Sequence, residues 1–210
     1  MSVLFFDLDN TLYSGSLGVV SRIDRRINEY LAWHVGIPAA DVDALRRRYW
    51  QEHGTTLRGL TACHAVDADD YLEYVHDIEL DDLLKPALEL RALLDRIGGR
   101  KMVFTNASRA HARRVLRRLD LQGAFDLVIG LEDLGYVPKP QPEAFRTALD
   151  RAGARAEGSA LIDDLRPNLA TAKRLGMRTV WVTEDEGPAD DAVDHVVGDI
   201  FGIESIFCTI

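Results

Sequence analysis

The stretch Val3-Leu4-Phe5-Phe6-Asp7-Leu8-Asp9-Asn10-Thr11-Leu12-Tyr13 decides the fold, because four apolar residues run directly into two carboxylates that are one residue apart. A short apolar run bounded by a polar turn predicts a strand buried on both faces, as in a parallel sheet. Asp7 then lies at the carboxyl end of the strand and Asp9 just beyond it. Because ligands of open α/β sheets bind at that edge, we expect a functional site there.

Two other interpretations of this stretch are open at this point. Asp7 to Thr11 begins like an EF-hand calcium loop, but such a loop needs Gly at position six and Glu at position twelve, where the chain has Leu12 and Gly18. The other interpretation is a solvated polar turn after a strand, and the stretch alone does not decide between that turn and an active site.

The composition bounds the class of protein and its partners. The chain has 210 residues and a formal net charge of −9, which indicates one domain, or a core with a modest insertion, and disfavours a nucleic-acid partner. The basic run Arg113-Arg114 with Arg117-Arg118 fits the exposed face of a helix. Cys63 and Cys208 lack metal-ligand spacing and are expected to be free thiols. With no signal for secretion or a membrane span, we expect a cytoplasmic protein with no membrane partner.

The pattern of the chain changes near residue 86. Between residues 15 and 85, apolar residues recur at helical spacing, and this excursion is too long for a simple crossover, so it predicts an inserted helical cap. Further along, predicted strands alternate with helices; the strands are expected at 102–104, 126–129, 160–162, 179–182 and 193–197. Such alternation predicts an α/β fold, a Rossmann-like parallel sheet with helices on both faces. We therefore expect a core domain of residues 1–14 and 86–210 and a cap domain of residues 15–85.

Polar residues recur where the predicted strands end. Besides Asp7 and Asp9, they are Thr105 and Asn106, Lys139 in a later loop, and Asp163 and Asp164. Because the carboxyl ends of parallel strands share one edge of the sheet, we expect these residues to converge. Two like charges about 4 Å apart repel by roughly 4 kcal/mol at an effective dielectric constant near 20, so the four carboxylates require cations. A hard ion such as Mg²⁺ would relieve the repulsion, and Lys139 adds a second positive charge.

These residue types predict phosphoryl transfer from a small-molecule phosphate ester. Asp7 is a plausible covalent nucleophile, as in enzymes that form an aspartyl-phosphate. Asp9 would protonate the leaving alkoxide and later deprotonate the water that cleaves the aspartyl-phosphate. Thr105 can donate its hydroxyl to a phosphoryl oxygen, and Lys139 would neutralise charge in the transition state.

The remaining strand-end residues are predicted to bind phosphate and metal. The amides of Asn106 and Ala107 lie where the next helix begins, which is a natural anion site. Asp164 would bind the metal, with Asp163 beside it as a further candidate ligand and Asn168 in support. Each of these residues alone also has a structural explanation, such as a helix cap or a surface lysine. Their joint order along the chain is what favours an active site.

The motifs resemble those of the haloacid dehalogenase superfamily, matched here by Asp7 to Thr11, Thr105-Asn106, Lys139-Pro140 and Asp163-Asp164. The resemblance covers about residues 1–14 and 86–200. It implies that Asp7 is the nucleophile, that Asp9 is the acid and base, and that the metal ligands are Asp7, the backbone carbonyl of Asp9, and Asp164. The dehalogenases lack the second Asp of the first motif, so Asp9 implies phosphate chemistry.

The cap region is similar to that of the pyrimidine 5′-nucleotidase branch of this superfamily. The stretch Tyr49 to Leu60 resembles its Y-x-x-x-G-T-T-L-x-G-L segment, with Trp50 where Tyr is usual, and Val75-His76-Asp77 resembles its V-H-D segment. Outside the cap, Leu165 departs from the small polar residue common there. The resemblance implies hydrolysis of UMP- or CMP-like nucleotides to nucleoside and phosphate.

Polar residues of the cap are candidates for reading the substrate. A pocket needs few polar groups to orient a base, and the candidates are Thr55, Thr56, Arg58 and His64. The alternative is that Gly54-Thr55-Thr56 forms a turn and helix cap. His76-Asp77 lies near the return to the core and is expected to be a hinge or a structural contact.

Three other functions compete with a nucleotidase. A phosphoacceptor signalling domain also combines an acidic pair with Asp, Thr and Lys, but there the pair comes first, whereas here Asp163 and Asp164 come last. A phosphatase or phosphomutase acting on a sugar phosphate or another small phosphometabolite would share the core, and only the cap argues against it. A catalytically silent binding protein is disfavoured because every motif residue is present.

Overall fold

The computed structural model describes residues 2–184 and 191–208. The acidic segment 184–191, predicted to be a solvated loop, lies outside the described residues except at its two ends. Within the described part of the chain, no helix combines the length and the apolar character that crossing a membrane requires. Both cysteines are free.

A sheet of parallel strands forms the centre of the larger of two compact units. The strands are β1 Val3–Phe6, β2 Arg100–Phe104, β3 Leu127–Ile129, β4 Ser159–Asp163, β5 Arg178–Val182 and β6 His195–Val197. Their order across the sheet is β3-β2-β1-β4-β5-β6, which places β1 in the interior. Because β1 is covered on both faces, its four residues are all buried. The predicted fold class is confirmed, and each predicted strand is present within a few residues of its expected bounds.

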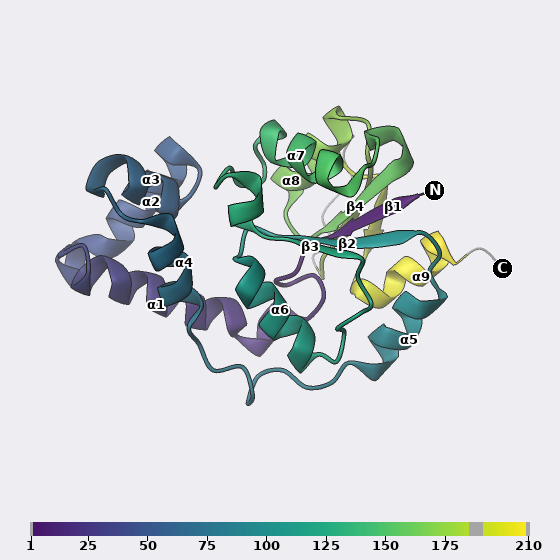
Figure 1. Cartoon of the computed structure of the whole chain (residues 1–210), viewed down its shortest axis with the longest axis horizontal. Helices are drawn as coiled ribbons and strands as arrows, with labels where there is room; N and C mark the ends of the chain where they lie inside the picture. The colour runs from purple at the N-terminus through teal and green to yellow at the C-terminus, as the bar shows by residue number, and fades with distance from the viewer. Residues whose placement is uncertain (1, 185–190, 209–210) are drawn as a thin grey trace. The chain divides into compact units, whose positions relative to one another are not determined.

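Helices cover both faces of this sheet. They are α5 Leu88–Arg96, α6 Arg109–Arg118, α7 Pro142–Ala152, α8 Arg166–Arg174 and α9 Glu204–Phe207. Figure 1 shows α7 and α8 on one face and α5, α6 and α9 on the other. Ser108 caps α6, since its Oγ accepts a hydrogen bond from the backbone N–H of His111. Helix α9 was not predicted, because four residues are too few to show a helical period.

The second compact unit is Gly18–Leu80, and the first comprises Met1–Leu17 with Asp81–Ile210. The helical unit contains α1 Val19–Trp33, α2 Val42–His53, α3 Thr56–His64 and α4 Ala68–His76. Gly59 allows α3 to lie close to α2, because a Cβ at this position would come within 2.2 Å of the Tyr49 ring. His76, predicted to be a hinge or a structural contact, is buried, and its Nδ1 lies 2.8 Å from the carbonyl oxygen of Leu72 in the same helix.

Candidate active site

The predicted site residues of the core meet at the carboxyl edge of the sheet. Phe6 pairs with Val103 on one side and with Ile162 on the other. One residue further on, Asp7 therefore lies between the ends of β2 and β4, and its backbone N–H donates to the carbonyl oxygen of Ile162 at 2.9 Å. Thr105 follows β2 directly, and Asp163 is the last residue of β4.

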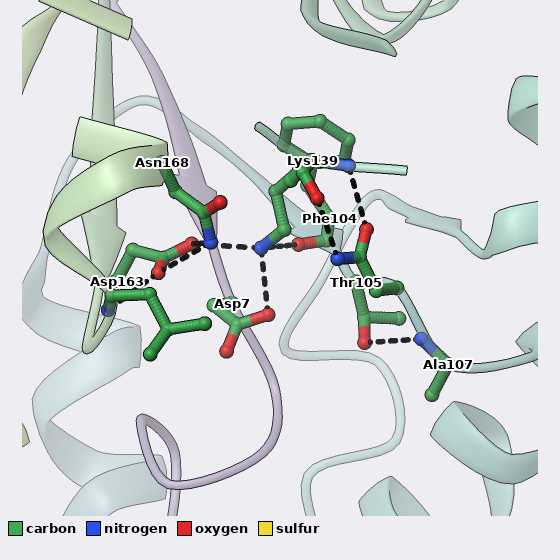
Figure 2. A network of polar contacts seen from close by, with 9 residues as sticks. Asp7, Phe104, Thr105, Ala107, Lys139, Asp163 and Asn168 are labelled. Carbon is green, nitrogen blue, oxygen red and sulfur yellow. Dashed lines mark hydrogen bonds and ion pairs between the residues drawn. The ribbon is translucent and has the colours of Figure 1, made fainter. Parts of the chain in front are cut away.

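Lys139 connects the ends of three segments (Figure 2). Its Nζ donates to Asp7 Oδ1 at 2.7 Å, to Asp163 Oδ2 at 2.7 Å and to the carbonyl oxygen of Phe104 at 2.8 Å. An ammonium group has three hydrogens, so each one has an acceptor. The lysine is only 3% exposed, Asp7 is 8% exposed and Asp163 is 0% exposed. The sequence alternative of a surface lysine is therefore wrong.

The loop that carries Lys139 is held by Asn106 rather than by local contacts alone. Asn106 Oδ1 accepts from the backbone N–H of Lys139 at 2.8 Å, and Asn106 Nδ2 donates to the carbonyl oxygen of Lys139 at 3.0 Å. The sequence predicted Asn106 only as part of a phosphate-binding turn. Its side chain instead binds both polar groups of one distant residue, and only the tertiary structure could reveal this.

The turn after β2 was predicted to offer the backbone amides of Asn106 and Ala107 to an anion, and the amide of Ala107 differs from this prediction. The backbone N–H of Ala107 donates to Thr105 Oγ1 at 3.0 Å, so this amide already has an acceptor (Figure 2). Such a local bond from the amide two residues on is common for Thr in turns. The Thr105 hydroxyl accepts this bond through its oxygen, so its own hydrogen remains a donor. Thr105 thus keeps the property for which the sequence singled it out.

The two adjacent carboxylates after β4 have different surroundings. Asp163 Oδ1 accepts from the backbone N–H of Leu165 at 2.9 Å and from Asn168 Nδ2 at 2.9 Å, while Asp163 Oδ2 accepts from Lys139. Burial raises the pKa of Asp164, and the nearby Asn10 side chain is among the groups that oppose this rise. Asp163 is the last residue of β4, whereas Asp164 lies in the bend that follows it, so the two side chains have different neighbours.

Three carboxylates form a group that is able to hold a metal ion. Oxygen atoms of Asp7, Asp163 and Asp164 all lie within 4.8 Å of one another. A donor set made only of oxygens suits a hard cation such as Mg²⁺. Because the oxygens of Asp163 are engaged by Lys139, Asn168 and a backbone amide, Asp7 and Asp164 are the members best placed to act as ligands.

The electrostatics of the group also fit a cation. Burial, reinforced by Asp163 and Asp164 and opposed by Lys139, holds the pKa of Asp7 well above its usual value. Burial and Asp163, again opposed by Lys139, raise the pKa of Asp164 to about 6. For Lys139, burial alone would lower the pKa, but Asp163 and Asp7 outweigh burial, so its pKa is raised. One ammonium thus faces more carboxylates than it can neutralise, and a divalent cation would balance the remainder.

Asp9 has two aromatic neighbours that the sequence did not single out. The Tyr13 hydroxyl donates to Asp9 Oδ1, and Nε2 of His111 lies 3.5 Å from the same oxygen. Burial, together with Asp9, raises the pKa of Tyr13, so the phenol keeps its proton and remains a donor. The sequence indicates the contact with Tyr13 only through its short spacing from Asp9. It gives no sign of the contact with His111, because His111 lies in α6, about one hundred residues further along the chain.

A cavity of about 840 Å³ within the core unit reaches Asp164. This volume is in the range of small-molecule sites. The lining combines hydroxyl-bearing and charged residues with apolar ones, and includes Ser14, Ser16, Lys85, Thr183, Leu12 and Phe201. Another cavity, of about 640 Å³, lies at the amino ends of the strands beside Val3 and Ser159, away from the acidic group. Of these two cavities, the first is the one that reaches the acidic group.

The candidate substrate-reading residues lie on the helical unit in different roles. Thr55 caps α3, since its Oγ1 accepts from the backbone N–H of Arg58 at 3.2 Å, in agreement with the helix-cap alternative. The side chain of Arg58 is exposed, and His64 Nε2 lies 2.6 Å from the Tyr49 hydroxyl. Thr56 lines a cavity of about 490 Å³ on this unit. Substrate reading by Thr55, Thr56, Arg58 and His64 stays a prediction.

Comparison with known proteins identifies the family of this chain. A model of the haloacid dehalogenase-like hydrolases matches residues 1–176. Phosphate metabolism protein 8 of Saccharomyces cerevisiae is 30% identical in an alignment 201 residues long, which covers 87% of this chain and 62% of the yeast protein. The chain therefore spans less than two thirds of that relative. A probable phosphatase, IndB, of Dickeya dadantii is 37% identical over 86% of this chain and 80% of its own length.

Solved structures of similar fold cover the entire chain. A phosphatase from Thermococcus onnurineus superposes with a TM-score of 0.66 at 17% identity, covering 98% of this chain and 97% of its own. A hydrolase of Bacillus subtilis, YfnB, whose structure was determined with bound magnesium, superposes with a TM-score of 0.66 at 19% identity, covering 100% and 99% of the two chains. At these identities, the likeness concerns the fold.

Proposed function

The chain belongs to the haloacid dehalogenase-like hydrolases, and we propose that it is a Mg²⁺-dependent phosphatase that transfers the phosphoryl group of a small monoester to Asp7. The observation that carries this proposal is the buried contact of Lys139 Nζ with Asp7 and Asp163, with Asp164 in the same group. The ammonium holds Asp7 at the end of a rigid interior strand. A carboxylate fixed in this way can attack phosphorus without first reorganising.

In the proposed reaction, a carboxylate oxygen of Asp7 forms a bond to phosphorus while the ester P–O bond breaks. Asp9 gives its proton to the leaving alkoxide. Asp9 then takes a proton from water as the water oxygen attacks the phosphorus of the aspartyl-phosphate, releasing phosphate and restoring Asp7. Thr105 donates its hydroxyl hydrogen to a phosphoryl oxygen, and Lys139 opposes the negative charge.

Asp7 and Asp164 are the residues we propose to hold Mg²⁺, which when bound supplies positive charge beside the phosphoryl oxygens. The backbone carbonyl of Asp9 is the third ligand that the family resemblance implies. Asp163 instead holds Lys139 and Asn168, so we assign it a supporting role.

Two observations support phosphate ester cleavage rather than dehalogenation. Asp9 provides a second carboxylate that can move a proton to an alkoxide, which a carbon–halogen bond does not require. Several relatives are named phosphatases, including the probable phosphatase of Dickeya dadantii. Solved structures named dehalogenases are also similar, but at about 18% identity they support only the shared fold.

For the substrate, we propose a pyrimidine nucleoside 5′-monophosphate, with the Gly18–Leu80 unit as a cap that selects it. The support is the cap sequence from Tyr49 to Leu60 and the position of Thr56 in the lining of a cavity of that unit. The alternative is a sugar phosphate or another small phosphometabolite. It is favoured by relatives named phosphoglycolate phosphatase, such as that of Aquifex aeolicus at 24% identity. A cytoplasmic location and the absence of nucleic-acid and membrane partners stay predictions.

Phosphate release from a panel of monoesters tests the proposal. The panel contains UMP, CMP, AMP, GMP, phosphoglycolate and sugar phosphates, each with Mg²⁺ and with excess chelator. We expect UMP and CMP to be hydrolysed with a kcat/KM about tenfold or more above that of the purine nucleotides, and chelator to remove the activity. A preference for phosphoglycolate or a sugar phosphate would reject the nucleotide but keep the phosphatase. Absence of metal-dependent release from every substrate would reject the phosphatase itself.

The metal requirement is expected to depend on pH. An ionised Asp164 is needed to bind Mg²⁺, and its raised pKa of about 6 means that protons compete with the metal below that value rather than below the ordinary value near 4. The Mg²⁺ concentration for half-maximal activity should be constant above about pH 7 and should rise roughly tenfold per pH unit below about pH 5.5. Titrating Mg²⁺ at a series of pH values checks this expectation. A flat response between about pH 5 and 7 would contradict the role of Asp164 as a ligand.

A further inference from the structure

One oxygen of Asp9 is contacted from two directions inside the core unit. Tyr13, in the turn after β1, donates its hydroxyl hydrogen to Oδ1. His111, in the first turn of α6, places Nε2 3.5 Å from the same Oδ1. Tyr13 is buried, His111 is only 1% exposed, and Asp9 is half-buried. Two side chains that lie far apart in sequence thus converge on a single oxygen of the proposed acid and base.

We propose that Tyr13 and His111 are positioning residues for Asp9, holding Oδ1 of its carboxyl group so that Oδ2 carries the proton delivered to the leaving alkoxide. This inference rests on the proposed function, in which Asp9 is the general acid. A carboxylic acid can carry its proton on either oxygen, and only one of the two arrangements points the proton at the ester oxygen. A phenol is protonated at neutral pH and donates to Oδ1, so the acid proton is directed to the other oxygen.

The two residues restrain Asp9 in complementary ways. Tyr13 is four residues from Asp9 and belongs to the same turn, in which Asn10 has a left-handed φ of 62°. His111 belongs to a helix whose start is fixed by Ser108, so it anchors the carboxyl group to a separate element. The 3.5 Å between His111 Nε2 and Asp9 Oδ1 is longer than an ordinary hydrogen bond, and such distances in active sites often shorten when substrate binds. Loss of either restraint leaves the carboxyl group free to rotate.

Leaving groups of different basicity separate this role from a merely structural one. An alkoxide needs a proton as the ester bond breaks, whereas p-nitrophenolate leaves without one. The value of kcat/KM reports the steps up to phosphorylation of Asp7, before Asp9 acts as a base. A residue that positions the acid therefore affects kcat/KM for an alkyl ester and spares the p-nitrophenyl ester. A residue that only supports the fold lowers both values together.

The test compares Tyr13→Phe, His111→Leu and His111→Gln with the wild type on p-nitrophenyl phosphate and on the best alkyl monoester of the panel. We expect Tyr13→Phe and His111→Leu each to reduce the ratio of alkyl to aryl kcat/KM by roughly tenfold or more. An Asp9→Asn variant, which lacks the acid itself, should change this ratio in the same direction. His111→Gln, which keeps an N–H donor, should recover part of the ratio. Tyr71→Phe, which removes the hydroxyl of a buried tyrosine of the helical unit, should leave the ratio unchanged.

Each outcome bears on the inference. Equal losses on both esters, or no loss on either, would overturn the positioning role, and failure of His111→Gln to exceed His111→Leu would overturn the part assigned to His111. Melting temperatures close to that of the wild type establish that the variants are folded. A wild type inactive on both esters would instead reject the proposed function, and the inference with it.

Discussion

Replacing Asp7 with Asn is expected to reduce phosphate release by about 10⁴-fold or more, because the amide lacks the nucleophilic oxygen that attacks phosphorus. Removing the nucleophile of other covalent enzymes costs up to about 10⁶-fold in kcat. Asn matches Asp in size, and its carbonyl oxygen can still accept the hydrogen bond from Lys139. The geometry around β1 should therefore be preserved while the chemistry is lost.

The same variant is expected to unfold at an unchanged or higher temperature. Burial, opposed by Lys139 and reinforced by the neighbouring carboxylates, holds the pKa of Asp7 above its usual value, which means that ionising Asp7 costs more free energy in the folded protein than in the unfolded chain. A neutral amide removes this penalty. Loss of activity with retained stability is the pattern expected of a catalytic group rather than of a structural one.

Steady-state phosphate release and a thermal melt measure these two effects, with intact mass confirming that the Asn has not deamidated. Asp150→Asn, which changes an exposed carboxylate on α7, is the matched control and should leave both unchanged. If Asp7→Asn keeps a tenth or more of the activity, Asp7 is not the nucleophile. A large fall in melting temperature would show that the lost activity reflects misfolding.

Replacing Lys139 with Met should affect both stability and activity. The ammonium is the buried cation that joins Asp7 and Asp163, and methionine has a similar length but no charge. Breaking a buried ion pair by removing one partner costs about 3 to 5 kcal/mol in the free energy of unfolding, because the other charges remain buried without compensation. Activity should fall by roughly 10²-fold or more, since charge on the phosphoryl group is no longer opposed.

Denaturant unfolding measures the change in stability. Thermal melts with and without Mg²⁺ check whether the change arises from the lost positive charge. Because Mg²⁺ can replace part of the missing positive charge, it should raise the melting temperature of Lys139→Met more than that of the wild type. Lys173→Met is the matched control, since Lys173 pairs with Asp194 at the surface and such pairs contribute about 1 kcal/mol or less. A loss in Lys139→Met no larger than in this control would contradict the central role of the lysine.

Much of the core could be predicted because its signals are local. The apolar run Val3–Phe6 and the later apolar runs identify strands by residue type, and carboxylates or hydroxyls directly after them identify the functional edge. The structure confirms each strand and brings Asp7, Lys139, Asp163 and Asp164 together. Parallel pairing alone is sufficient to produce this convergence, so no contact needed to be known in advance.

The cap residues illustrate where local signals become ambiguous. A Gly-Thr-Thr sequence serves equally as a helix start and as a set of substrate contacts, and for Thr55 the structure shows the helix cap. Residue type cannot separate the two roles, since a hydroxyl accepts from a backbone amide as readily as from a ligand. Substrate reading by the four cap candidates stays a prediction, which substrate measurements can test.

By itself, the sequence determined the α/β fold, the edge of the sheet that carries the site and the residue types that the chemistry needs, because these depend on periodicity and on position relative to strand ends. The tertiary structure alone decided how those residues share the work. In the folded protein, Asp163 accepts hydrogen bonds from Lys139 and Asn168, and Asn106 binds the backbone of Lys139. His111 lies beside Asp9. Each of these contacts joins residues from different elements, or depends on which way adjacent side chains point. Such contacts depend on how the elements pack in three dimensions, and this packing produces no periodic pattern of residue types along the sequence.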